Sequence, residues 1–342
     1  MKLITFAVPS YNSQDYLNKC VDSLLMGGED VEIIIVDDGS TDGTAALADA
    51  YEAAYPAIVR AVHKPNGGHG SGVNKGLELA TGLYYKVVDS DDWLDVDALK
   101  TLLSTLKRHV AEGETADLYV TNFVYERVAD KSRYVSRYTG TLPVNRFFGW
   151  EETKPLRLWK MYLMHALIYR TEMLRATGLK LPEHTFYVDN IFAYTPLPYV
   201  KKLFYLNIDL YRYYIGRSDQ SVTVDNVVKR FDQQINITRI MLREYGYNRI
   251  ESMCKPLRRQ MYHCLHVMLM NTYFFTTAKD EPLRRQLFAL MWNELKINDK
   301  KLYRRLKRMP LVWILDRLCW KVKGRVTTTS YRFLCKHVKL GA

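Results

Sequence analysis

The sequence predicts an α/β fold, with a Rossmann-like, mostly parallel central sheet flanked by helices, followed by an all-α C-terminal region. Two patterns predict it. In the first part of the 342-residue chain, short apolar runs rich in β-branched residues alternate with stretches of 3.6-residue apolar period, as in strand-helix-strand units. From Asp225 onward the period is helical to the end. The change of period predicts two domains, residues 1–224 and 225–342.

The elements of the first domain follow in order. Apolar runs predict strands at residues 3–8, 31–36, 58–62 and 83–88, with helices between them at about 15–26, 45–54 and 73–80. Units of this length form right-handed crossovers, so these strands are expected to be parallel and to end at one edge of the sheet.

The pattern is less regular after residue 117. Further strands are expected at 118–124, 162–170, 202–206 and 210–221, and the alternating segment 125–142 predicts an exposed hairpin. In the second domain, helices are expected at 227–245, 255–277, 282–295, 299–308 and 311–322.

Three carboxylates follow the fourth strand within four residues. They are Asp89, Asp91 and Asp92, with Ser90 between them and Trp93 directly after. Alternate residues of an extended segment project to the same side, and hard divalent cations prefer carboxylate oxygens, so the Asp-x-Asp spacing predicts a metal site. The alternative is a solvated turn that caps the helix beginning near Asp95.

The first three strands also end in polar or glycine-rich segments. The first ends at residues 9–12 with an aromatic ring, Tyr11, and the second runs into residues 37–44. Because strand exits converge at one edge of such a sheet, a ligand site is expected there. The loop 66–72 has neither dinucleotide-fingerprint nor P-loop spacing, so it indicates a close backbone approach to a ligand or helix, or a flexible loop.

Taken together, these segments resemble glycosyltransferase family 2, the inverting nucleotide-sugar transferases with the GT-A fold. Where the family often has Ala-Arg-Asn, this chain has Gly72-Val73-Asn74, so no role is transferred to Val73. The segments that carry the resemblance are Val8-Pro9-Ser10-Tyr11-Asn12, Val36-Asp37-Asp38-Gly39-Ser40-Thr41-Asp42, Asn66-Gly67-Gly68 with Asn74, and Val88-Asp89-Ser90-Asp91-Asp92.

The resemblance implies roles for particular residues. Tyr11 and Asp38 would contact the base and ribose of the nucleotide, and Asp89 and Asp91 would bind Mn²⁺ or Mg²⁺. Many members use as catalytic base the aspartate of a Glu-Asp pair that opens a helix at this distance. Here the pair reads Val188-Asp189, so Asp189 is the candidate base, with an ordinary helix N-terminal aspartate as the alternative. The other donor-site candidates are Pro9, Asn66, Gly67, Ser90, Asp92, Trp93 and Gln220.

Three basic side chains complete the candidate set. His165 lies in the middle of an expected strand, as an interior residue or as an acceptor or phosphate contact. Segment 210–221 looks like the one that closes the transferase domain in a bacterial subset of the family. Arg212 or Arg217 would then neutralise the departing diphosphate, with surface ion pairing as the alternative.

The net charge of +12 is concentrated at the C-terminus. Residues 301–342 carry twelve Lys and Arg against one acid, Asp316, which gives +11. Trp313 and Trp320 are seven residues apart, hence on one face of an expected helix. Basic amphipathic segments with tryptophan lie in membrane interfaces, so the tail predicts peripheral binding to the anionic inner face of the plasma membrane. Nucleic acid and a solvated helix face are the alternatives, but no nucleic-acid motif accompanies the charge.

Other features of the sequence argue against a membrane span, a signal peptide, a disulfide and a zinc site. No apolar run is long enough to span a bilayer, and the run before Pro9 is too short for a signal peptide. The five cysteines lack C-x-x-C spacing and indicate reduced cytosolic thiols, with neither a disulfide nor a zinc site expected. His263 and His266 have metal-ligand spacing but no neighbouring carboxylate, so packing is expected.

The predicted function is metal-dependent, inverting transfer of a sugar from a nucleotide diphosphate sugar, with UDP the family's commonest donor nucleotide. The expected acceptor is a hydroxyl of a saccharide or lipid-linked molecule in cell-envelope glycan or glycolipid synthesis. Two alternatives remain, a nucleotidyltransferase that makes a nucleotide sugar and a non-catalytic nucleotide-sugar binding module. The sequence leaves the sugar, the linkage and the oligomeric state open.

Overall fold

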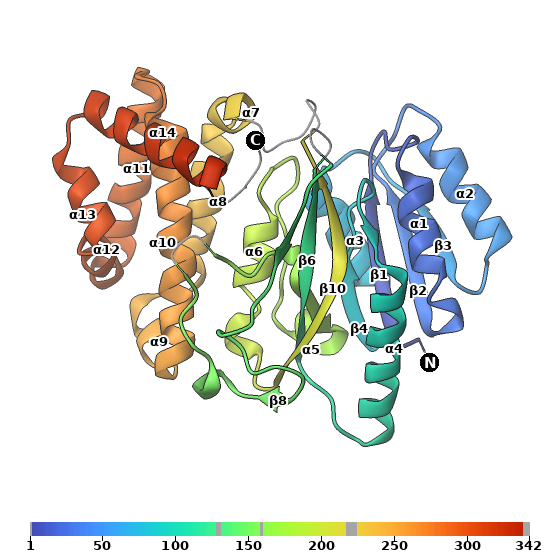
Figure 1. Cartoon of the computed structure of the whole chain (residues 1–342). Coiled ribbons are helices and arrows are strands. Elements are labelled where there is room, and N and C mark those ends of the chain that lie inside the picture. Colours follow the sequence, from blue (N-terminus) through green and yellow to red (C-terminus); the bar gives the residue numbers. More distant parts are fainter. Residues whose placement is uncertain (1, 128–130, 158–159, 217–223, 338–342) are drawn as a thin grey trace. The chain divides into compact units, whose positions relative to one another are not determined.

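The computed structural model describes the chain except for residues 1, 128–130, 158–159, 217–223 and 338–342 (Figure 1). It contains two compact units. Unit 1 comprises residues 1–154 and 162–214, and unit 2 comprises residues 155–161 and 215–342.

Four parallel strands form the N-terminal half of the sheet in unit 1. They are β1 (Ile4–Ser10), β2 (Val31–Asp37), β3 (Val59–His63) and β4 (Tyr84–Val87), in the order β3-β2-β1-β4. Ser10 pairs with Asp37 at the end of the β1–β2 ladder. The parallel sheet predicted from the sequence is confirmed, and the residues that follow its strands meet at one edge.

Antiparallel strands extend the sheet beyond β4. β9 (Leu167–Arg170) is antiparallel to β4 and to β6 (Leu118–Arg127), and β10 (Leu203–Ile215) is antiparallel to β5 (Trp93–Leu94). The predicted hairpin is present where β7 (Arg133–Ser136) pairs with β6, and β8 (Phe147–Phe148) pairs with β10. The sheet is therefore mixed, with strand order β3-β2-β1-β4-β9-β6-β10-β5.

Two strand predictions need correction. The strands expected at 202–206 and 210–221 form the single strand β10 through Ile215, because Asn122 of β6 donates to Asn207 and Asp209 and so supports the polar middle of β10. His165 is not in a strand: it lies on a 3-10 turn, Met164–Ala166, just before β9. Its carbonyl accepts a hydrogen bond from the Lys86 ammonium group instead of a strand neighbour.

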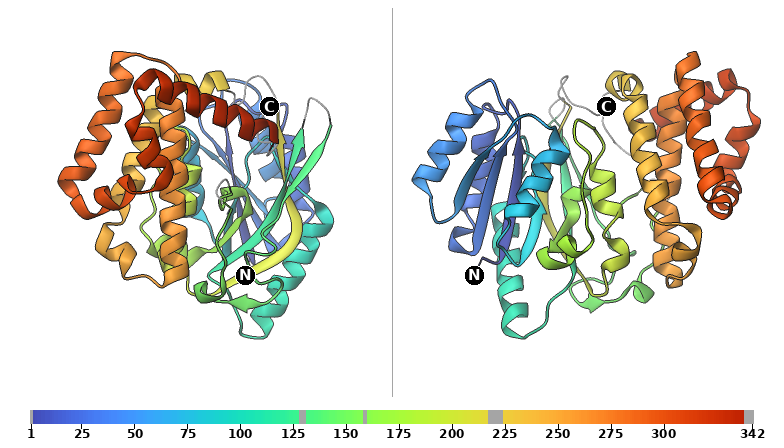
Figure 2. Two further views of the ribbon diagram at one scale, coloured as in Figure 1. Left: turned by 60° about the vertical axis from the view of Figure 1, so that its left-hand side comes forward. Right: turned by 180° about the vertical axis from the view of Figure 1, so that it is seen from behind.

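Helices cover both faces of the sheet. α1 (Leu17–Leu25) and α4 (Val96–Ala111) lie on one face and α3 (His69–Leu79) on the other (Figures 1 and 2). Asp95 caps α4 by accepting from the Ala98 amide at 3.0 Å, so the helix cap comes after the carboxylate cluster. The remaining helices of unit 1 are α2 (Thr44–Ala54), α5 (Thr171–Ala176), α6 (Asp189–Tyr194) and the short 3-10 turns Gly28–Asp30, Trp150–Glu152 and Leu197–Tyr199.

From Val224 to His337 the regular elements of unit 2 are all helices, as predicted. Its longest helix, α10 (Lys255–Thr277), has a largely buried surface, and a buried hydrogen bond of 2.8 Å joins Thr238 to Thr272. The others are α7 (Val224–Lys229), α8 (Phe231–Glu244), α9 (Tyr247–Glu251), α11 (Pro282–Asn298), α12 (Lys300–Lys307), α13 (Pro310–Arg317) and α14 (Trp320–His337).

The expected helix over 311–322 is wrong, and Trp313 and Trp320 do not share a helix face. α13 ends at Arg317, and Leu318 has an extended backbone before α14 begins. Trp320 instead donates its indole N–H to the Lys279 carbonyl and packs edge-on against Phe288, which anchors the start of α14.

Two further sequence expectations can be compared with the structure. His263 packs as expected, with its Nε2 2.7 Å from the Lys160 carbonyl. The cysteines that the structure describes in detail, Cys20, Cys254, Cys264 and Cys319, are free thiols. Within the described residues, no helix combines the length and apolar character needed to cross a membrane.

Candidate active site

Asp89 lies where β4 ends, and its carboxylate is paired with an imidazole. His69, the first residue of α3, places Nε2 2.8 Å from Asp89 Oδ1. The Asp89 amide donates to the Tyr211 hydroxyl at 3.1 Å, which fixes the turn against β10. Burial alone would raise the pKa of Asp89, but His69, His165 and Lys86 outweigh it and lower that pKa, so the side chain is an anion at neutral pH.

Asp92 is the buried anchor of the same turn. Its two carboxylate oxygens accept from the Tyr211 hydroxyl at 2.6 Å and from the Tyr214 amide at 2.8 Å. Burial, with repulsion from Asp91 and Asp89, raises the pKa of Asp92 well above its ordinary value. Two acidic groups from one turn are thus held close together in a dry environment, which is costly unless a positive charge joins them.

His165 lies beside these carboxylates in a cage of aromatic rings. Its ring stacks on Tyr211 at 4.6 Å and contacts Tyr213 at 4.4 Å. The side chain is buried, and Nδ1 has no hydrogen-bond partner among the residues that the structure describes. Burial lowers the pKa of His165 to about 4, so the imidazole is neutral. Lys86, fully buried on β4, donates to the His165 carbonyl at 2.6 Å, and burial lowers its pKa to about 7.

This part of the site fits a divalent cation. Asp89, Asp92 and His165 each offer a ligand atom, and these atoms lie within 4.8 Å of one another. Carboxylate oxygen and neutral imidazole are ordinary ligands of divalent metals. A buried nitrogen without a partner is what a coordination position would leave. Asp91 is half-buried and lies outside this group of three.

Asp189 reaches the cluster from a segment one hundred residues further along the chain. It is the first residue of α6 and accepts from the Asn190 amide group at 3.1 Å. Burial raises the pKa of Asp189 to about 6, and the charges of His69 and Asp89 are near enough to act on it, His69 lowering and Asp89 raising that pKa. A carboxylate with this pKa is ionised at neutral pH and can accept a proton.

The segment that carries Asp189 is fastened to α3. Asn74 makes a pair of hydrogen bonds with the backbone of Leu181, at 2.8 Å to its carbonyl and 2.9 Å from its amide. A Cβ on Gly70 would lie 2.6 Å from the Pro182 carbonyl oxygen, and Gly68 has φ +81° beside the His184 amide. The glycine-rich loop therefore permits close approach of another backbone segment, and α3 begins four residues earlier than expected.

A second group of residues lies beyond β1 and β2. The buried Asp38 carboxylate accepts from the amides of Gly67 at 3.0 Å and Gly68 at 2.6 Å, and from the Lys64 ammonium group at 2.6 Å. Asn66 donates to the Asp38 carbonyl at 2.9 Å. The Tyr11 side chain is 52% exposed at the end of β1. An exposed ring thus stands at the same sheet edge as a backbone turn organised by Asp38.

Comparisons with known proteins identify the family. The model of glycosyl transferase family 2 matches residues 5–170. An uncharacterized glycosyltransferase of Mycoplasma pneumoniae is 30% identical over 273 residues, which are 75% of this chain and 85% of that protein. The chain belongs to glycosyltransferase family 2. It is therefore a glycosyltransferase, which excludes the nucleotidyltransferase and the non-catalytic binding module.

Two more similarities bear on the length and the fold of this family 2 enzyme. Glycosyltransferase GlyA of Streptococcus pneumoniae is 28% identical over 226 residues, 64% of this chain but 31% of GlyA. Residues 1–349 of TarS from S. aureus, solved in complex with UDP-GlcNAc, match with a TM-score of 0.66 and 18% identity over 97% of this chain and 92% of that one. The GT-A fold with a helical C-terminal region, expected from the sequence, is confirmed.

The structure separates the remaining candidates. Ser90 shares a 2.7 Å hydrogen bond with Ser13, and Trp93 stacks under the Lys19 ammonium group, 3.0 Å from the ring centroid. Pro9 is buried against Gly72 of α3, where an added Cβ would lie 2.9 Å from the proline. Arg217 and Gln220 lie outside the described residues.

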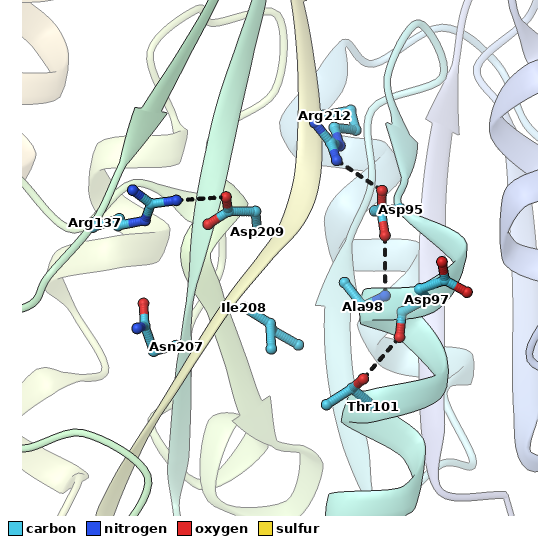
Figure 3. Close-up of a pocket in the computed structure, with 9 residues that line it drawn as sticks. All are labelled: Asp95, Asp97, Ala98, Thr101, Arg137, Asn207, Ile208, Asp209 and Arg212. Carbon is cyan, nitrogen blue, oxygen red and sulfur yellow. Dashed lines mark hydrogen bonds and ion pairs between the residues drawn. The ribbon is translucent and has the colours of Figure 1, made fainter.

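Arg212 faces a different environment from its neighbours Tyr211 and Tyr213. Its guanidinium group pairs with Asp95 at 2.7 Å and Glu126 at 3.2 Å, and it lines a surface pocket of about 550 Å³ (Figure 3). In the same pocket Arg137 pairs with Asp209 at 2.9 Å. The predicted role of Arg212 toward a diphosphate stays a prediction.

Three residues that sequence reasoning did not select are part of the site. His69 pairs with Asp89, Lys86 supports the His165 turn, and the Tyr211 hydroxyl joins Asp89 to Asp92. A lysine in the middle of an apolar strand was a usable signal, because such a residue is buried only with a partner. Nothing local in the sequence distinguishes Tyr211 from the other tyrosines of β10.

Proposed function

We propose that this enzyme transfers a sugar from a nucleotide diphosphate sugar, with a UDP-sugar as donor, to a hydroxyl of a saccharide or lipid-linked acceptor, with inversion at the anomeric carbon. The product would belong to a cell-envelope glycan or glycolipid. The observation that supports this most is the convergence of Asp189 on Asp89 and His69, which puts a carboxylate of pKa about 6 beside the Asp-x-Asp turn.

Asp189 is the proposed base. In a single displacement, the acceptor oxygen attacks the anomeric carbon, the bond to the diphosphate breaks with its electron pair, and Asp189 takes the acceptor proton. Its half-buried position excludes much of the water that would compete with an acceptor. Inversion follows because attack and departure occur on opposite faces of the sugar.

Asp89 and Asp91 are proposed to hold Mn²⁺ or Mg²⁺. When bound, the cation supplies positive charge where the departing nucleoside diphosphate becomes negative. The chain contributes a turn that is already fixed: the Asp89 amide and the Asp92 carboxylate are both bonded to Tyr211. The backbone of the turn therefore needs little rearrangement on binding.

Tyr11 and Asp38 are proposed to contact the nucleotide. The exposed Tyr11 ring offers a stacking surface for a base. The Asp38 carboxylate already accepts hydrogen bonds from Gly67, Gly68 and Lys64, so its proposed contribution combines direct contact with holding the loop in place. The complex of TarS with UDP-GlcNAc supports UDP-GlcNAc as the first donor to try.

The experiment is a transfer assay with a panel of UDP-sugars, MnCl₂ and saccharide or lipid-linked acceptors. Asp189→Asn should lower kcat at least about 100-fold, the usual contribution of a positioned base, while leaving UDP affinity within about threefold. Asp15→Asn, the same substitution at an exposed aspartate, is the matched control. If the Asp189→Asn variant released or transferred the sugar at the wild-type rate, the assignment of Asp189 as the base would be contradicted.

The basic C-terminal segment is proposed to bind an anionic membrane surface, at the inner face of the plasma membrane. Leu311, Trp313 and Ile314 of α13 are 38%, 48% and 47% exposed, whereas Val312 and Leu315 are buried. Arg304 and Arg308 precede them and are exposed. An apolar patch beside arginines suits a lipid headgroup region, and it would bring the enzyme to a lipid-linked acceptor.

A further inference from the structure

The feature that the proposed mechanism leaves unused is the buried nitrogen of His165. Its ring is held by stacking on Tyr211 and contact with Tyr213, and its backbone is held by Lys86. Within the described part of the chain, Nδ1 is buried and has no hydrogen-bond partner. A rigid, buried polar atom without a partner costs free energy unless something binds it.

Two carboxylates lie beside the His165 ring. The ligand atoms of Asp89, Asp92 and His165 lie within 4.8 Å of one another. Asp92 accepts two hydrogen bonds from neutral donors, and a carboxylate has about four lone-pair positions, so acceptor capacity remains. Asp89 is the least buried of the three, with its side chain 23% exposed.

We propose that His165 Nδ1 is a direct ligand of the divalent cation that Asp89 holds, so that the site combines carboxylate oxygens with one imidazole nitrogen. The proposal rests on the proposed function only in that the cation is the one beside the donor diphosphate. It adds a ligand from outside the Asp-x-Asp turn.

The nitrogen ligand has a consequence for metal selection. Mg²⁺ prefers an all-oxygen shell, whereas first-row transition metals accept imidazole. His165 would therefore favour Mn²⁺ over Mg²⁺. Asn offers an oxygen at a similar position, so His165→Asn should reduce the preference for Mn²⁺ over Mg²⁺, measured as the ratio of their Kd values.

The test uses the full chain loaded with MnCl₂, with and without UDP, and electron spin echo spectroscopy of the bound Mn²⁺. Nitrogen modulation from a directly bound imidazole is expected in the wild type, and it should change to the ¹⁵N pattern when histidine is ¹⁵N-labelled. This measurement needs no variant and so does not depend on how substitutions fold.

Two variants identify the histidine. His165→Phe keeps a ring between Tyr211 and Tyr213, and it should lose the nitrogen signal and raise the Mn²⁺ Kd at least about tenfold. His69→Phe is the matched control, because His69 also touches Asp89, and it should keep the signal. Loss of the signal in His69→Phe alone, or its persistence in His165→Phe, overturns the proposal.

The outcomes separate this inference from the proposed function. Mn²⁺ bound without any nitrogen coupling, with Asp89→Asn abolishing the binding, leaves the proposed function intact and overturns His165 as a ligand. Failure of the wild type to bind Mn²⁺ even with UDP overturns both.

Discussion

Asp189 combines a remote sequence position with a raised pKa, and this makes its pH dependence testable. Burial raises that pKa to about 6, and a base must be deprotonated to act. As the pH falls below about 6, kcat/KM should therefore drop about tenfold per unit, because the fraction of ionised Asp189 drops by that factor. A rate profile from pH 4.5 to 8 with saturating metal measures it. A profile that stays flat to pH 5 would contradict the role of Asp189.

The same residue should reduce the stability of the fold at neutral pH. Its pKa is 3.8 ordinarily and about 6 when folded, so the folded state binds the proton more tightly. The stability that this group contributes is then fully present below about pH 3.8 and is lost as the pH rises through about 6. Asp189→Asn should therefore raise the free energy of unfolding at pH 7.5 by the order of 2 kcal/mol, with a smaller gain near pH 4.5. Urea unfolding at both pH values measures this, with the exposed Asp15→Asn as control.

At the scale of elements, the position of Asp189 depends on the attachment of residues 181–188 to α3. Asn74→Ala removes two hydrogen bonds to Leu181, each worth about 1 kcal/mol, and frees the segment to move. A base displaced by about 1 Å can lose up to about 100-fold in rate, so kcat should fall at least about tenfold while UDP affinity changes little. Stopped-time assays and UDP titrations measure the two effects.

Lys75→Ala is the matched control for this attachment. Lys75 follows Asn74 on α3, and its side chain forms an ion pair with Glu78 on the helix surface, which contributes little to stability. If Asn74→Ala and Lys75→Ala lowered kcat equally, any substitution on this part of α3 would reduce activity. The proposal that Asn74 in particular positions Asp189 would then be wrong.

The elements also show how far sequence reasoning extends. β1, β2, β3 and β4 were predictable because each is a short apolar run between turn residues, and their parallel order follows from the helices between them. The meeting of His69 with Asp89 was not, because it requires α3 to begin inside the glycine-rich loop. The glycines of that loop leave room for Pro182 and His184 to pack on it, and this contact between distant segments cannot be inferred from local sequence.

The antiparallel half of the sheet was harder to predict for a related reason. Asn207 and Asp209 are turn formers by composition, yet side-chain bonds to Asn122 keep them within β10. Because β10 continues without a break, the register of the whole strand decides on which face of the sheet Arg212 lies. Its ion pairs with Asp95 and Glu126 therefore could not be inferred from spacing alone. Tertiary hydrogen bonds overrode local propensity in both cases.

At the scale of the whole molecule, all described residues of the candidate site belong to unit 1, and the basic segment belongs to unit 2. Chemistry and membrane binding should therefore be separable by point substitution. Deleting residues from 301 onward is a poor test, because Leu302, Leu306 and Val312 are fully buried within unit 2. Surface substitutions on α13 avoid exposing that core.

The triple variant Leu311→Ser, Trp313→Ser, Ile314→Ser should lose co-sedimentation with phosphatidylserine vesicles, because it removes the exposed apolar patch. Transfer to a soluble acceptor should stay within about twofold of the wild type, since no residue of the candidate site changes.

Arg304→Glu with Arg308→Glu should weaken binding to anionic but not to neutral vesicles, and 0.5 M salt should reduce wild-type binding in the same way. Met26→Ser, at an equally exposed apolar residue of unit 1, controls for loss of surface hydrophobicity. Vesicle binding by the triple variant at the wild-type level would show that α13 does not contact lipid, and the membrane proposal would then fail while the transferase assignment stands.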